Sequence, residues 1–205
     1  GELAVMKNFL TLGEDLGKLY YQLEHEAIEK VEVIYSGALA EMETSMITRA
    51  VLKGVFEPIL KERVNYVNAE VTAGGRGVEV IESKENTPQN LLTVKIHSKG
   101  NLFTAAGNVT PEGEVRIKNI NGYQFDVEPM PFMLAVNNED KPGMIGQLGT
   151  LLGAARVNIA TMQVSRNLQN GVAMMLMTVD NEVVPETLKL LQGVTGFSRL
   201  RQLKM

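Results

Sequence analysis

The sequence predicts an α+β protein of two domains, and three observations lead to this prediction. Apolar residues in the first third recur at three- and four-residue steps, as in Leu16, Leu19 and Leu23, which is the periodicity of amphipathic helices. From residue 78 onward apolar and polar residues alternate, which is typical of strands. Two prolines, Pro129 and Pro131, then separate this block from a second one.

The first block, residues 1–128, is expected to contain two long helices and an antiparallel sheet. Asn121-Gly122 lies between two alternating segments and indicates a tight hairpin, because both residues accept positive φ. Pro58 is expected to kink or end the second helix. We expect helices at 3–26, 44–61 and 64–73, and strands at 31–37, 78–82, 91–97, 102–109, 115–120 and 123–127.

The second block, residues 132–205, follows a stiff linker at 129–131, where the prolines interrupt backbone hydrogen bonding. Its patterns occur in the order strand, helix, strand, strand, helix, strand, which is the ferredoxin-like βαββαβ arrangement. One helix is expected to begin near Pro142. The other expected elements are strands at 132–136, 158–165, 171–179 and 197–203, and a helix at 185–192.

Composition limits the possible functions. The 205 residues carry a net charge of −4, so no global electrostatic case exists for binding nucleic acid or an anionic membrane. No apolar run approaches the roughly 18 residues of a membrane span. The absence of cysteine excludes disulfides and thiolate chemistry, and two histidines are too few for a histidine-based metal site without help from carboxylates. A cytoplasmic location is compatible with the lack of cysteine, and we expect a cytoplasmic protein without a metal.

The most informative stretch covers residues 137–165. Asp140 precedes the expected helix and can accept hydrogen bonds from its unpaired backbone N–H groups, and Pro142 suits the first helical turn. Three glycines spaced by three residues keep one helix face thin, so that another group can approach the backbone. These are Gly143, Gly146 and Gly149.

The N-terminus of this helix suits a small ligand that carries both a carboxylate and an amine. It offers free N–H groups and a partial positive charge, and Asn138, Asp140 and Asn158 flank it. A purely structural interpretation is that Asp140 caps the helix and Asn158 supports a positive-φ turn. Capping and ligand binding are compatible at one helix end.

Other candidate motifs favour structural roles. The glycines near residue 75 lack the strand–turn–helix context of a dinucleotide site. The acidic stretch around His25 is typical of a solvated helix end, and His97 on an alternating strand is expected to be exposed. Three methionines are expected in the core or in an interface: Met174, Met175 and Met177. Three basic residues are candidates for an anion site or plain surface positions: Arg76, Arg116 and Lys118.

Residues 132–180, with Asp140-Lys141-Pro142-Gly143 and Val157-Asn158-Ile159-Ala160, resemble an ACT domain, a regulatory module that binds amino acids. Segments upstream are similar, in the same order, to the intervening, allosteric-substrate-binding domain of long-form D-3-phosphoglycerate dehydrogenases. These segments are 16–19, 31–37, 49–54, 64–69 and 120–123.

The resemblance implies that the chain is the C-terminal regulatory part of such an enzyme, which oxidises 3-phosphoglycerate with NAD in the first step of L-serine biosynthesis. The first residue is Gly1 rather than Met, which also suggests a fragment. The chain itself would then hold no catalytic residue and no cofactor, because NAD binds in the catalytic part. In this family, ACT domains pair into an eight-stranded sheet and bind L-serine where they meet.

By motif position, Asp140 is the expected partner of the serine ammonium, and Asn138 lies beside it. Asn158 is expected to reach in from the neighbouring subunit. Backbone N–H groups near the helix start and an asparagine amide would take the carboxylate. The residues at this helix start are Gly143, Met144 and Ile145.

Two alternatives stay open, and two positions depart from the family pattern. Some members bind anions in the intervening domain through basic residues near the last hairpin. Here Arg116 remains, but Tyr123 and Glu128 stand where basic residues would help. The first alternative is a regulatory subunit of an L-serine dehydratase, which without cysteine could not itself hold an iron–sulfur cluster. The second is an oligomerisation module without a ligand.

Overall fold

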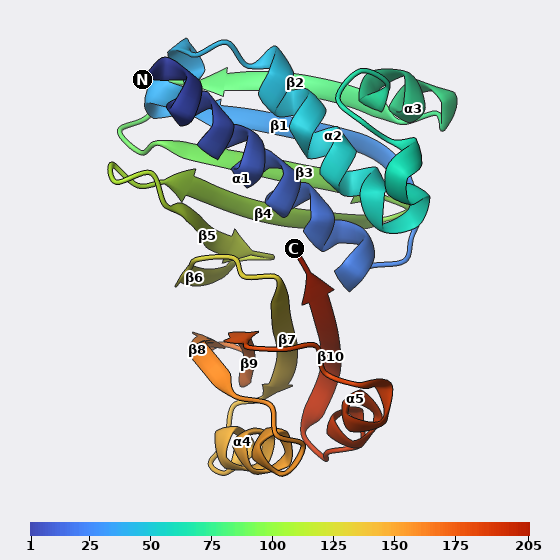
Figure 1. Ribbon diagram of the computed structural model, residues 1–205, viewed down its shortest axis with the longest axis vertical. Coiled ribbons are helices and arrows are strands. Elements are labelled where there is room, and N and C mark those ends of the chain that lie inside the picture. The colour runs from blue at the N-terminus through green and yellow to red at the C-terminus, as the bar shows by residue number, and fades with distance from the viewer. The chain divides into compact units, whose positions relative to one another are not determined.

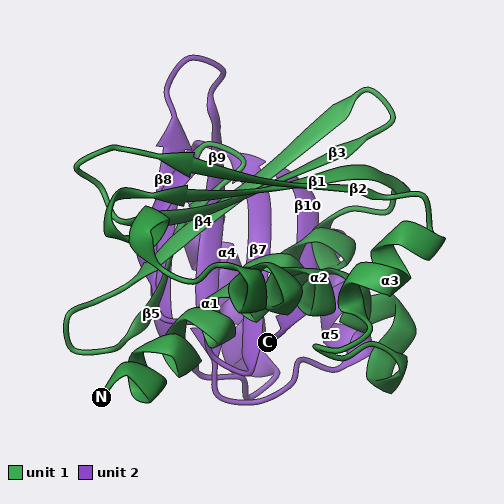
Figure 2. Cartoon of the chain, turned by 90° about the horizontal axis from the view of Figure 1, so that it is seen from above, with its two compact units in different colours: residues 1–122 green, residues 123–205 purple.

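The computed structural model describes residues 1–205 and shows helices packed on sheets (Figure 1), which confirms the α+β class. The chain divides into two compact units, Gly1–Gly122 and Tyr123–Met205 (Figure 2). The division falls in the turn between β5 (Val115–Ile120) and β6 (Tyr123–Val127). The linker expected at 129–131 comes later in the chain and stays a prediction.

The first unit contains the two long helices that the sequence predicts. Asn121 and Gly122 both have positive φ, of 51° and 86°, which confirms the tight turn after β5. Strands β1 to β5 follow the order β2-β1-β3-β4-β5. The elements are α1 (Glu2–Leu23), β1 (Ile28–Ser36), α2 (Ser45–Leu60), α3 (Ala69–Gly75), β2 (Glu79–Glu85), β3 (Leu91–Ser98), β4 (Asn101–Val109) and β5, with 3₁₀ turns at Gly37–Glu41 and Lys61–Arg63.

The start of α3 was wrongly predicted at residue 64, because two asparagines fold the preceding segment into a turn. The Asn65 side-chain oxygen accepts hydrogen bonds from the N–H groups of Val67 and Asn68, both at 2.9 Å. The Asn68 side-chain oxygen in turn accepts the N–H of Asn65 at 2.8 Å. Such local side-chain bonds compete with helix formation, so α3 begins only at Ala69.

The sheet of the first unit is mixed, so the prediction of a purely antiparallel sheet is wrong. Strands β1 and β2 pair in parallel, from Lys30 opposite Glu79 to Ser36 opposite Glu85. A parallel pair needs a long crossover connection, and α2 and α3 supply it. The β1–β3, β3–β4 and β4–β5 pairs are antiparallel as expected.

Helices α1 and α2 cover one face of this sheet and approach each other at two glycines (Figure 1). A Cβ atom on Gly17 would overlap the carbonyl oxygen of Val51, and one on Gly54 would overlap that of Glu14. The two backbones can therefore approach only because these positions lack a side chain. Leucines of α1 are completely buried in this unit: Leu12, Leu16 and Leu19.

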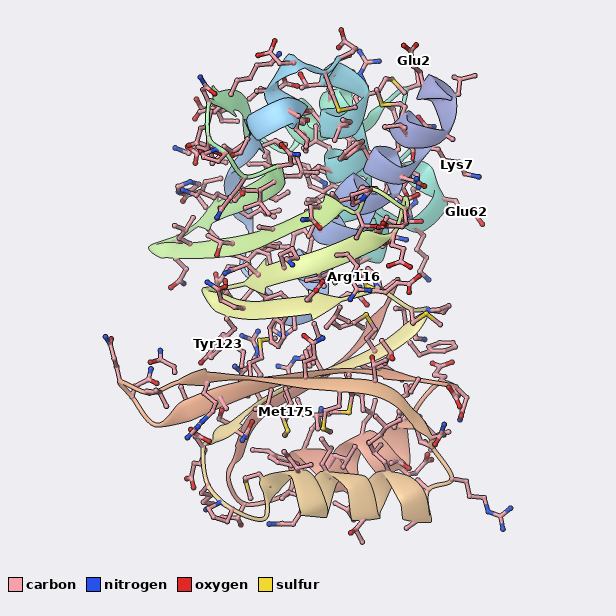
Figure 3. The ribbon with its side chains drawn as sticks, turned by 90° about the vertical axis from the view of Figure 1, so that its left-hand side faces the viewer. Glu2, Lys7, Glu62, Arg116, Tyr123 and Met175 are labelled. Carbon is pink, nitrogen blue, oxygen red and sulfur yellow. The ribbon has the colours of Figure 1, made fainter.

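The second unit has the predicted ferredoxin-like order, with a four-stranded sheet arranged β10-β7-β9-β8. Helices α4 and α5 lie on one face of this sheet, and Met175 points to that face (Figure 3). The expected burial of Met174, Met175 and Met177 is confirmed. The elements are β7 (Phe132–Glu139), α4 (Met144–Ala154), β8 (Ile159–Asn167), β9 (Val172–Val179), α5 (Pro185–Gln192) and β10 (Phe197–Lys204).

Strand β6 is bound to β8 through two side chains of β8. The N–H of Gln124 donates to Ser165 Oγ at 2.9 Å, and the N–H of Asp126 donates to Gln163 Oε1 at 2.8 Å. Strand β8 pairs through its backbone only with β9. Length and hydrophobicity together rule out a membrane-crossing segment for α1 and for each of the other helices.

The contact between α1 and α2 generates a stability prediction. Gly54→Ala should lower the free energy of unfolding by about 1–3 kcal/mol, because the added methyl group forces the two backbones apart. Gly74→Ala is the matched control: it lies in α3, and its Cβ would meet nothing within 4 Å. Urea unfolding of the two variants tests this, and equal stability would show that the helices are not in close contact.

A second prediction concerns Asp15 of α1, which is 8% exposed. Burial raises the pKa of its carboxyl from 3.8 to about 6, opposed by Lys18 and reinforced by Glu14 and Glu57. The folded state therefore binds more protons than the unfolded state between about pH 4 and 6, and stability should fall as pH rises through this window. The full loss corresponds to roughly 3 kcal/mol.

Asp15→Asn should remove this dependence and be more stable than the original chain above pH 6. Denaturant unfolding at pH 4, 5, 6 and 7 measures the difference directly. Parallel stability curves for the two proteins would contradict a buried, reluctantly ionised carboxyl.

Candidate ligand-binding site

The candidate site lies at the start of α4, where three strands bring three residues into one row. Asn138 of β7 lies opposite Ala173 of β9, and Ala173 lies opposite Arg166 of β8. Asn138 has the same parity as Leu134 and Val136, which belong to the core beneath the helices, so the row faces the helices. The ends of the row are about 10 Å apart. Its middle residue contributes only a methyl group.

Asn138 leaves one polar atom without a partner inside the protein. Its side chain is 4% exposed, and its Nδ2 donates to the carbonyl oxygen of Glu139 at 2.7 Å. Its Oδ1 is buried and accepts no hydrogen bond. A buried acceptor without a donor costs about 1–3 kcal/mol. The atom suits a ligand hydroxyl or ammonium. The strand expected at 132–136 is longer than predicted, because β7 continues through Asn138 to Glu139.

The N-terminus of α4 is uncapped, so the predicted capping by Asp140 is wrong. The helix begins at Met144 after Gly143, whose φ is 90°, and no side chain bonds to its first N–H groups. Pro142 likewise lies before the helix rather than in its first turn. The first intrahelical bond runs from the N–H of Gln147 to the oxygen of Gly143, at 3.0 Å. The earlier N–H groups remain available to an anion, which the helix dipole also favours.

Asp140 bonds to the β8–β9 hairpin instead of capping the helix. Its Oδ2 accepts a hydrogen bond from Nε of Arg166 at 2.8 Å, and its N–H donates to the oxygen of Gly171 at 2.9 Å. Arg166 is not among the residues that the sequence predicts for this site. Its alternation with Met162 and Val164 could have placed it on the helix-facing side of β8. The alternation within β8 could not show that Arg166 lies beside Asp140.

The face of α4 that the glycines form is open, as the sequence predicts. A Cβ on Gly146 or Gly149 would meet nothing within 4 Å, whereas Met144 is buried. Ile145 is about half exposed beside them. This part of the helix can therefore approach another surface closely.

Asn158 lies at the opposite end of the unit from Asp140. Its Nδ2 donates to Asp180 Oδ2 at 2.8 Å. Eight residue steps along an extended chain separate it from Arg166 by roughly 25 Å. One chain therefore does not bring Asn158 to Asp140. The predicted role in a positive-φ turn is also wrong, because Arg156, with φ of 59°, takes that conformation.

The remaining candidates lie in the first unit. Arg116 of β5 (labelled in Figure 3) has its Nη1 3.7 Å from Glu114 Oε2. His97 is half-buried rather than exposed, because its Nε2 lies 3.3 Å from Glu32 Oε2 on the adjacent strand. The glycines near residue 75 end α3 and lead into β2, so they form no phosphate loop. No cluster of acidic and histidine side chains is arranged to hold a metal ion.

The second unit is thus a ferredoxin-like domain with an anion-favouring helix end beside an acidic side chain and a buried amide. Two family models match the chain: the D-3-phosphoglycerate dehydrogenase intervening domain over residues 5–121, and the ACT domain over residues 132–196. The chain therefore belongs to the D-3-phosphoglycerate dehydrogenase family, with an intervening domain followed by an ACT domain.

Curated relatives agree with this assignment. The D-3-phosphoglycerate dehydrogenase of Archaeoglobus fulgidus is 39% identical over 196 residues, which cover 93% of this chain and 37% of that protein. The Bacillus subtilis protein of the same name is 34% identical, over 94% of this chain and 37% of its own length. For the Synechocystis protein the values are 36%, 93% and 35%. The chain thus spans little more than a third of these relatives.

Proposed function

We propose that the chain is the C-terminal regulatory part of a D-3-phosphoglycerate dehydrogenase, and that it binds L-serine and associates with itself. The name of the relatives and the two family matches support the assignment to this enzyme. NAD-dependent oxidation of 3-phosphoglycerate would take place in the part of the relatives that this chain does not cover. The catalytic residues and NAD would lie there, in a cytoplasmic enzyme.

The main support for an amino-acid ligand is the unpaired Oδ1 of Asn138 beside an uncapped helix end. On three neighbouring carbon atoms, L-serine carries a carboxylate that accepts hydrogen bonds, an ammonium that donates them and a hydroxyl that can do both. Its carboxylate would accept hydrogen bonds from the backbone N–H groups near Gly143, Met144 and Ile145. The helix dipole would strengthen this interaction. Its ammonium would bind Asp140, and its hydroxyl would give Asn138 the missing donor. The hydroxyl contact would favour serine over alanine.

The two edges of the sheet differ in a way that supports self-association through β8. Edge strands that carry charged residues resist pairing with another chain. Strand β10 carries Arg199, Arg201 and Lys204, whereas β8 has no charged residue before Arg166. Antiparallel pairing of two β8 strands would bring the start of one beside the end of the other. Asn158 of a second copy would then lie near Asp140 and could supply an amide to the ligand carboxylate.

Calorimetry with L-serine tests the ligand, with D-serine and L-alanine as controls. Asp140→Ala should weaken L-serine binding by about 1.5–3 kcal/mol, because it removes a charge-assisted hydrogen bond. Glu186→Ala, which removes an exposed carboxylate from α5, should leave binding unchanged. Equal affinity of the Asp140 variant would reject the assignment. No heat with any amino acid at millimolar concentration would leave an assembly module.

L-Serine should also tighten the association of two chains, because a ligand that bridges two subunits binds the dimer better than the monomer. Sedimentation velocity at several protein concentrations, with and without L-serine, gives the dimer dissociation constant. A constant that does not respond to saturating L-serine would mean that the site is complete within one chain.

A further inference from the structure

The carboxylate that the proposed function assigns to the ligand ammonium is already engaged by a cation of the protein. Arg166 Nε donates to Asp140 Oδ2 at 2.8 Å. We infer that Arg166 is an internal competitor for this carboxylate, so that an amino-acid ligand binds by displacing the guanidinium from Asp140. The inference rests on the proposed function, because it requires a ligand amine at Asp140.

The strand register places Arg166 where it can do this. It ends the row Asn138–Ala173–Arg166 on the helix-facing side, and only the small side chain of Ala173 lies between the two longer ones. The backbone of Asp140 is held by the bond from its N–H to the oxygen of Gly171. The short Asp140 side chain therefore stays close to its anchored backbone, whereas the long Arg166 side chain has the reach to swing away.

The exposed fractions of the two side chains show which of them is more accessible from solvent. The side chain of Asp140 is 21% exposed, and that of Arg166 is 60% exposed. The guanidinium is thus the more solvent-exposed member of the pair, and an arriving ammonium has to compete with it for the carboxylate. A solvent-exposed ion pair of this kind contributes at most about 1 kcal/mol, which corresponds to about a fivefold change in ligand affinity. A ligand can therefore displace the guanidinium.

A competitor of this strength would select ligands by the number of their contacts. An amine that binds only to Asp140 exchanges one ion pair for another and gains little. L-Serine also engages the helix N–H groups and Asn138, and Arg166 opposes neither contact. The guanidinium would therefore exclude simple amines while lowering the affinity for L-serine only slightly.

The test compares L-serine affinity in the original chain, Arg166→Gln, Asp140→Asn and the double variant. Arg166→Gln should bind L-serine about two- to fivefold more tightly, and ethanolamine should gain at least as much. The substitution should give no gain in the Asp140→Asn background, because the competition acts only through this carboxylate. Lys189→Gln is the matched control: it removes one positive charge from α5, which packs on β10 at the opposite edge of the sheet.

The outcomes separate the two proposals. Unchanged L-serine binding by Arg166→Gln would overturn the inference alone, and so would weaker binding, which would place Arg166 on the ligand carboxylate. Binding by Arg166→Gln but not by the original chain would support the competitor and remove L-serine as the effector of the original chain. Absence of binding in both would remove both proposals. In NMR spectra, L-serine should shift the Arg166 Nε–H signal of the original chain, and a signal that saturating L-serine leaves in place would also overturn the inference.

Discussion

The register between β7, β9 and β8 is the constraint on which the candidate site depends. A slip of one residue would turn every side chain of a strand to the other face of the sheet. Burial of Met175 and Met177 under α4 and α5 therefore fixes the register without any contribution from the site itself. The same register sets Asn138, Ala173 and Arg166 in one row. Core packing thus positions the polar groups, and these groups can be left imperfectly paired.

Two local costs meet at the start of α4. A side-chain cap is typically worth about 1 kcal/mol, and this helix lacks one. A buried amide oxygen without a donor adds a cost of similar size, and Asn138 Oδ1 has none. The buried residues Met144, Leu148 and Leu152 hold the helix on the sheet, so the fold tolerates both. Departures from helix capping and from full hydrogen-bond pairing are expected at functional sites, and here both departures occur next to each other.

The sequence predicts elements correctly where the signal is local. Helix 185–192 and strands 115–120 and 123–127 agree with α5, β5 and β6, because Pro185, Asn121 and Gly122 mark their ends. The prediction fails where distant residues decide. The parallel pairing of β1 and β2 depends on a crossover through two helices. The partner of Asp140 is Arg166, 26 positions along the chain, and only the strand register brings the two together. Asp140 was therefore recognised as important, but its bonding partner was not.

The distance between Asn158 and Asp140 decides what kind of site this is. Roughly 25 Å of extended strand separates them in one chain, so no small ligand can touch both there. A site that uses both residues must combine two chains, and the uncharged edge of β8 is the surface that would allow it. Ligand binding and association would then be linked, since each would complete the contacts that the other needs. Arg166 lies at the end of the edge strand, where the two processes would meet, and it bonds to Asp140, the proposed partner of the ligand ammonium. A single guanidinium could therefore influence both equilibria.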